Sequence, residues 1–168
     1  MANLQATTVT GVLTINGNTV HGSNSDVSPW YKLSIPSGTD AYVHVRTPMP
    51  ADTSALGWNP SILEVVGYHD YTSNIIYDFM ALLNVNGGNN DWYGSQIMRN
   101  DGTVSPLWVP FVYRSSNTYG GVTRVCFSVG KNTLSRNGYL WVRWFNNSAQ
   151  WTSYAWAISN SSSSSAVY

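Results

Sequence analysis

Hydrophobic and polar residues alternate over short stretches of this chain, and clusters of Gly, Pro, Asn and Ser separate the stretches. Alternation with a period of two is typical of half-buried β-strands, and many short strands between turns are typical of a sandwich or barrel. The sequence therefore predicts an all-β fold, an antiparallel β-sandwich of jelly-roll-like type. We expect strands near residues 30–35, 42–47, 62–68, 75–85, 93–99, 107–114, 124–129, 139–145 and 151–158.

The stretch 139–145 carries large apolar side chains on both of its faces. Successive strand residues point to opposite sides, which separates Tyr139, Trp141, Arg143 and Phe145 from Leu140, Val142 and Trp144. Such a strand is buried on each side or lies at a subunit contact.

Two other stretches deserve a separate prediction. The apolar residues between 74 and 85 fit a helical stripe about as well as a strand, and the neighbouring β-type stretches favour a strand. Pro106 and Pro110 bracket residues 107–109, and proline donates no hydrogen bond to a sheet. We therefore expect that strand to be a sheet edge or to be kinked.

An Asn-Gly pair divides the start of the chain into two β-type segments, 12–15 and 18–21. Asn16-Gly17 between such segments indicates a β-hairpin with a two-residue type I′ turn. We expect three regions: an N-terminal hairpin and attachment segment (1–28), a distal β-sandwich (29–158) and a flexible Ser-rich tail (159–168).

The charge balance excludes some classes of partner. The 168 residues include eight Lys+Arg and eight Asp+Glu, and only 10% are charged, against about 25% in an average domain. Nucleic-acid binding needs a basic patch, and binding at a membrane surface needs a basic amphipathic face. We expect neither nucleic-acid binding nor membrane insertion. The start of the chain lacks the basic and apolar regions of a signal peptide, so we expect the protein to remain where it is made until lysis.

Candidate catalytic groups are sparse. No nucleophile elbow or phosphate-binding loop occurs, and His21, His44 and His69 form no ligand pair. We expect no catalytic residue, metal or cofactor, although three copies of one histidine on a threefold axis stay an alternative. Cys126 lies in an apolar stretch and is expected to be buried and inert. Capsule hydrolysis also stays open, because such enzymes need only two carboxylates, and candidates are Glu64, Asp70, Asp78, Asp91 and Asp101.

Aromatic residues beside amides are plentiful, with eight Trp and eleven Tyr in the chain. Sugar C–H faces pack on aromatic rings, while amides and carboxylates bind the hydroxyls. The alternative is that these rings fill the core or a subunit interface, where Trp and Tyr are also enriched. The predicted glycan-binding residues, in or beside loops, are Trp58, Asn89, Asn90, Asp91, Trp92, Tyr93 and Tyr119.

The segment Leu13-Thr14-Ile15-Asn16-Gly17-Asn18-Thr19-Val20-His21 resembles a recurring hairpin of bacteriophage tail-fibre and related virion structural proteins. Members of that family commonly continue with an aromatic residue, His and Ala-Gly-Asn, whereas Val20-His21-Gly22-Ser23-Asn24 stands here. The resemblance implies a homotrimer, contacts with other virion proteins and recognition of a host-surface glycan. It implies an attachment segment made by Leu13, Ile15, Asn16, Gly17 and Val20.

These observations favour a non-enzymatic phage virion protein, a tail fibre or fibre tip that attaches to host-surface glycan. The alternatives are a capsid decoration or capsid-fibre protein and, from another class, a free lectin or carbohydrate-binding module. Either virion role implies assembly in the host cytoplasm and an extracellular location after lysis.

Overall fold

A computed structural model describes residues 13–15, 18–21, 28, 30–51, 61–69, 75–86, 91–102, 109–131, 138–145 and 156–168. Within these ranges, residues 13–15, 18–21, 75, 84–86 and 91–93 are described by their backbone alone. The predicted strands 30–35, 42–47, 62–68, 75–85, 93–99, 124–129 and 139–145 all correspond to observed strands.

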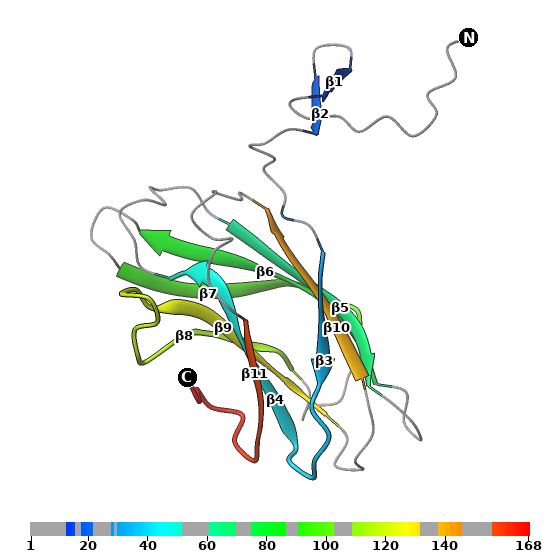
Figure 1. Cartoon of the computed structure of the whole chain (residues 1–168), viewed down its shortest axis with the longest axis vertical. Coiled ribbons are helices and arrows are strands. Elements are labelled where there is room, and N and C mark those ends of the chain that lie inside the picture. The colour runs from blue at the N-terminus through cyan, green and yellow to red at the C-terminus, as the bar shows by residue number, and fades with distance from the viewer. Residues whose placement is uncertain are drawn as a thin grey trace.

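Two antiparallel sheets pack face to face (Figure 1), which confirms the predicted all-β sandwich. The five-stranded sheet has the order β3-β10-β5-β6-β7, and the four-stranded sheet has the order β11-β4-β9-β8. The first comprises β3 (Tyr31–Ile35), β10 (Gly138–Phe145), β5 (Ser61–His69), β6 (Ile75–Asn86) and β7 (Asp91–Asn100). The second comprises β11 (Ala157–Ser161), β4 (Tyr42–Pro50), β9 (Arg124–Gly130) and β8 (Phe111–Arg114).

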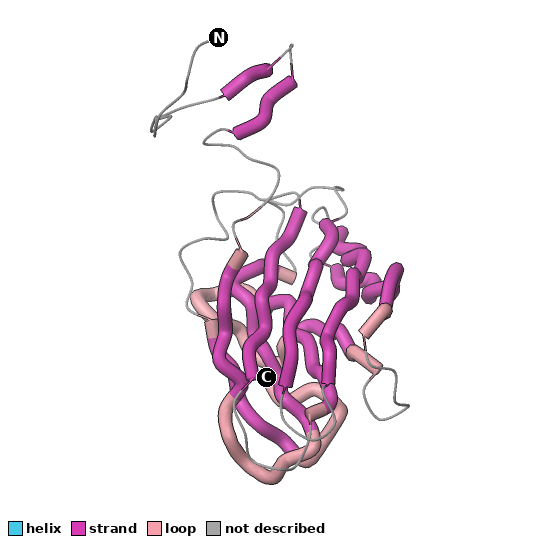
Figure 2. The backbone as a smooth tube through the Cα atoms, turned by 90° about the vertical axis from the view of Figure 1, so that its right-hand side faces the viewer, coloured by secondary structure: helices cyan, strands magenta, loops and turns pink. Residues whose placement is uncertain are grey.

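Successive strands of the chain belong repeatedly to different sheets, and Figure 2 shows the strands arranged in layers. Strand β4 leaves the sheet of β3, and β5 returns to it. On one side of the sandwich the edge strands β7 and β8 meet, and the Ser95 hydroxyl donates a hydrogen bond to the Val112 carbonyl at 3.1 Å. This contact between β7 and β8 joins the two sheets along one side of their shared core.

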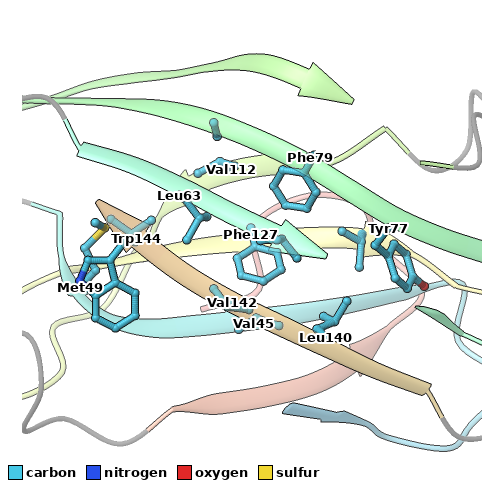
Figure 3. Close-up of a cluster of buried hydrophobic side chains, with 14 of the residues drawn as sticks. Val45, Met49, Leu63, Tyr77, Phe79, Val112, Phe127, Leu140, Val142 and Trp144 are labelled. Atoms are coloured by element: carbon cyan, nitrogen blue, oxygen red, sulfur yellow. The ribbon is translucent and has the colours of Figure 1, made fainter. Parts of the chain in front are cut away.

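The core consists of alternate side chains from both sheets (Figure 3). Phe79 of the larger sheet meets Phe127 of the smaller one edge to face, with ring centroids 5.7 Å apart. Trp144 is fully buried and stacks on Tyr31 at 5.2 Å. The burial of β10 alternates along its whole length, so Leu140, Val142 and Trp144 form its core face.

Residues 75–86 form a strand, as predicted, and not the alternative helix. Strand β6 is bonded along both sides, to β5 and to β7. Its buried side chains follow a period of two: Tyr77, Phe79, Ala81 and Leu83. The helical stripe in the sequence arises because three of the intervening residues, Ile76, Met80 and Leu82, are also apolar.

Strand β8 is an edge strand, as its prolines predict, but it is shorter than predicted. It begins at Phe111, directly after Pro110, and Val109 and Pro110 lie outside it. Residues 103–108, which include Pro106, lie outside the described residues. The missing N–H of Pro110 explains why the pairing with β9 starts one residue later.

The predicted N-terminal hairpin corresponds to β1 (Leu13–Ile15) and β2 (Asn18–His21), which pair antiparallel. The register shifts between Leu13 and Thr14. Asn16 and Gly17, the predicted turn, lie outside the described residues, and so do the side chains of Leu13, Ile15 and Val20. The hairpin pairing is therefore confirmed at the level of its backbone.

The end of the chain lies against the four-stranded sheet. Strand β11 continues to Ser161, three residues past the predicted end of the last strand at Ile158. We call residues 162–168 the C-terminal strap, because backbone carbonyls of Ser163 and Ser164 accept hydrogen bonds from His44 Nε2 (2.8 Å) and the Ser128 hydroxyl (3.2 Å). Part of the predicted Ser-rich tail is thus a strand, and the rest is hydrogen-bonded to the sheet.

Candidate functional site

The outer face of the five-stranded sheet carries the main concentration of aromatic and charged side chains. Register places Tyr139 beside Tyr68 and Tyr68 beside Ile76, so one row runs across three strands. Tyr68 is 47% exposed and Ile76 is 55% exposed. We call this surface the open face, and its members on β10 are Tyr139, Trp141, Arg143 and Phe145.

An aromatic cluster occupies one end of the open face. The Tyr68 ring lies 6.0 Å from the Tyr139 ring and 6.2 Å from the Trp141 ring, centroid to centroid. The Lys32 ammonium lies 3.9 Å from the centroid of Tyr139. A cation over an aromatic ring is attracted by the ring's electron density, so Lys32 holds this ring in place.

A network of ion pairs crosses the middle of the open face. Arg143 Nε donates to Glu64 Oε2 at 2.6 Å, and Arg99 Nη2 donates to Asp78 Oδ1 at 2.6 Å and to Glu64 Oε1 at 3.4 Å. The Glu64 side chain is only 11% exposed. Its two oxygens therefore bind two different arginines, and the negative charge is compensated within the chain.

Aromatic rings also flank Arg143. Its guanidinium carbon lies 4.3 Å from the centroid of Trp30 and 5.1 Å from that of Phe145. A guanidinium plane packs well on aromatic rings because it is weakly hydrated. The open face thus combines rings, apolar side chains and internally paired charges.

The predicted glycan-binding residues have different outcomes. Trp58, Asn89 and Asn90 lie outside the described residues. Asp91 and Trp92 were predicted in a loop, but they belong with Tyr93 to β7, because this strand begins two residues before the predicted start at residue 93. The side chains of these three residues lie outside the described part of the structure.

Tyr119 is the one predicted member of that site with a described side chain. The Arg46 guanidinium carbon lies 3.7 Å from the centroid of its ring, and Tyr168 of the C-terminal strap meets the ring edge to face at 6.5 Å. Its backbone carbonyl accepts hydrogen bonds from Arg124. Tyr119 therefore packs within the surface formed by the four-stranded sheet and the strap.

The prediction for Cys126 is confirmed, because its side chain is fully buried and burial raises the pKa of the thiol to about 12. A thiol with such a pKa is a poor nucleophile at neutral pH. His44 is buried and hydrogen-bonded through both ring nitrogens, to Tyr113 and Ser163. The surroundings of Cys126 and His44 therefore indicate a structural role for both side chains.

The candidate carboxylates of a hydrolase are engaged where the structure describes them. Glu64 and Asp78 bind arginine, and Asp101 lies 3.5 Å from Arg99. Among the described residues, no group of three or more His, Cys, Asp or Glu is placed to hold a metal ion. The described part of the chain also contains no helix long and apolar enough to cross a membrane.

A scan against known protein families finds no family model that matches the chain, and a search of curated proteins finds no match either. The alternation in 139–145 was the sequence signal for the open face. The pairing of Arg143 with Glu64 could not be predicted from local sequence, because the two residues are 79 positions apart in the chain.

Proposed function

We propose that this chain is a non-enzymatic bacteriophage virion protein, a tail fibre or fibre tip, that assembles with copies of itself and attaches to a host-surface glycan. The observation that supports it best is the open face. Trp, Tyr, Met and Arg are enriched at protein interfaces and supply most of their strongest contacts. Apolar side chains such as Ile76, at 55% exposure, are stabilised when a second copy covers them.

The electrostatics favour a second copy as the partner. The formal net charge is zero, so copies approach without long-range repulsion. Glu64 and Arg143 pair within the chain at 2.6 Å, so association leaves neither of these two charges without a partner. A homotrimer, which the hairpin resemblance implies, would place three glycan sites on one fibre tip. Weak sites displayed together gain avidity through their effective concentration.

The mass in solution tests the proposal. We expect sedimentation equilibrium at micromolar chain concentration to give the mass of three chains. Trp141→Asp should shift the protein toward the monomer, because a buried, unpaired charge costs about 3–5 kcal/mol. The matched control is Val167→Asp, which places the same charge on an exposed residue outside the open face. A monomeric parent protein would contradict the proposal.

A capsid decoration or capsid-fibre protein is the second candidate, since the open face would serve assembly on a shell equally well. Both candidates place the protein in the virion, with other virion proteins as neighbours. Labelling on intact particles separates them. A signal at the tail tip supports attachment, and a signal over the capsid supports decoration.

A further inference from the structure

A cleft of about 420 Å³ opens beside the four-stranded sheet, between the C-terminal strap and the start of β8. Val109, Pro110 and Phe111 form one wall, Ser164, Ser165 and Ala166 of the strap form another, and Tyr42 of β4 also lines the cleft. The volume lies within the range of about 300–1,000 Å³ that is typical of small-molecule sites. The Phe111 ring is 46% exposed.

A second cleft of about 380 Å³ is lined by the same ring. It runs between the edge strands β7 and β8, and Gly94, Ser95 and Ile97 line its far side. Pro110 and Phe111 line both clefts. An extended ligand could therefore cross the Phe111 ring and occupy both.

The Phe111 ring is held in place by stacking on a buried ring. It lies nearly parallel to the Tyr113 ring, with centroids 5.4 Å apart and planes 15° apart. Tyr113 is buried, and its hydroxyl lies 3.0 Å from His44 Nδ1. A carbonyl can only accept, so His44 Nε2 carries the proton donated to Ser163, and Nδ1 of the neutral ring accepts from Tyr113. A ring fixed in advance loses little entropy on binding.

The strap wall of the cleft is fixed by the same groups. His44 and Ser128 bind the carbonyls of Ser163 and Ser164, and the Val167 N–H donates to the Tyr113 hydroxyl at 3.4 Å. The strap is thus tied to the sheet before and after the residues that line the cleft. The cleft has two walls of defined position.

The chemistry of the lining selects the ligand class. Exposed rings pack against the C–H faces of sugars, and hydroxyls such as those of Ser164, Ser165 and Tyr42 pair with sugar hydroxyls. Among the described residues that line the two clefts, none carries a charge. An acidic sugar needs a cation for its carboxylate, and the described lining offers none.

We propose that the two clefts joined at Phe111 form the binding site for an uncharged oligosaccharide. This inference rests on the proposed function and names both the site and the glycan class. It differs from the predicted site in the loop residues 89–93. It also assigns a role to the C-terminal strap, which forms one wall of the site.

A glycan-binding comparison tests the proposal. Maltohexaose, cellohexaose and hexa-N-acetylchitohexaose serve as neutral probes and oligogalacturonate as the acidic probe, with saturation-transfer NMR on the full chain. We expect the parent protein to bind a neutral probe. Phe111→Ala should weaken that binding about tenfold, the equivalent of about 1.4 kcal/mol. Met98→Ala is the matched control, because Met98 is an exposed apolar residue that is not among the lining residues of either cleft.

The outcomes separate the inference from the proposed function. The inference is overturned if only the acidic probe binds, if no probe binds, or if Phe111→Ala binds a neutral probe as tightly as Met98→Ala does. Sedimentation and circular dichroism show whether Phe111→Ala keeps its fold and mass. If Phe111→Ala does not, the binding test is repeated with Phe111→Leu, which keeps an apolar side chain but has no ring. A trimer that fails these binding tests retains its assembly role, whereas a monomer contradicts the proposed function.

Discussion

The two outer faces of the sandwich differ in how far other parts of the chain cover them. Side chains of the four-stranded sheet such as His44 and Ser128 are buried beneath the C-terminal strap and bonded to its carbonyls. The open face of the five-stranded sheet keeps Tyr68 and Ile76 about half exposed, and no described segment buries them. Within the described residues, the chain covers one face with its own strap and leaves Tyr68 and Ile76 of the other face about half exposed.

The chemistry of the two faces matches this difference. The covered face forms hydrogen bonds to backbone carbonyls of the strap. Such bonds require one particular segment of the chain to lie within hydrogen-bonding distance. The open face pairs its charges internally, through Glu64 with Arg143 and Asp78 with Arg99. Much of its remaining surface is apolar and aromatic, as at Tyr68, Ile76 and Trp141, and a partner can cover these side chains without leaving their polar groups unpaired.

Removal of the cover should have the largest effect. A chain that ends at Ser161 loses the hydrogen bonds from His44, Ser128 and Ser116 to the strap, together with the contact of Arg46 with Tyr168. At about 1 kcal/mol net for each bond, we expect the free energy of unfolding to fall by about 4 kcal/mol in urea denaturation.

A chain that ends at Ser165 is the control for this truncation. It keeps the carbonyls of Ser163 and Ser164 that bind His44 and Ser128. We expect about half of the loss. Equal stability of both truncated chains and the parent protein would show that the strap contributes no stability.

Disruption of the ion-pair network should have a smaller effect. Glu64→Gln leaves Arg143 and Arg99 without the largely buried negative charge between them, and we expect a loss of about 1–3 kcal/mol in thermal and urea unfolding. Asp101→Asn is the matched control, because the Asp101 side chain is 68% exposed and its effect should stay within about 0.5 kcal/mol. Equal losses in the two variants would mean that the burial of Glu64 is unimportant.

The smallest effect concerns pH and belongs to the covered face. Burial lowers the pKa of His44 from 6.5, so the folded protein binds a proton there less readily than the unfolded chain does. The stability contributed by neutral His44 is therefore fully present above about pH 6.5 and declines as the pH falls through the lowered pKa. We expect the unfolding temperature to fall between about pH 7 and about pH 5.

The variant His44→Gln isolates this contribution. It removes the titrating ring but keeps a side chain that can donate a hydrogen bond to the Ser163 carbonyl. The decline in unfolding temperature should be shallower in the variant than in the parent protein. Parallel pH profiles would assign the decline to other groups.

Local pattern predicted most of the strands, and long-range packing decided what they form. The alternation in 139–145 marked two apolar faces, but both faces carry large rings, so the sequence did not indicate that Trp144 lies in the core and Trp141 outside. The Ser-rich end has no apolar period. Its strap depends on donors such as His44, 119 residues away, which no local pattern reveals.

The place of β10 in the sheet has a consequence for synthesis. Strand β10 lies between β3 and β5, although more than sixty residues separate its start from the end of β5 along the chain. A chain emerging from the ribosome cannot close this sheet until residue 145 is available, and such non-local pairing is slow to form. Since β10 supplies Trp141 and Arg143, an unfinished chain lacks these members of the open face. Until β10 is in place, the edges of β3 and β5 that it pairs with are open, and such edges can pair with another chain.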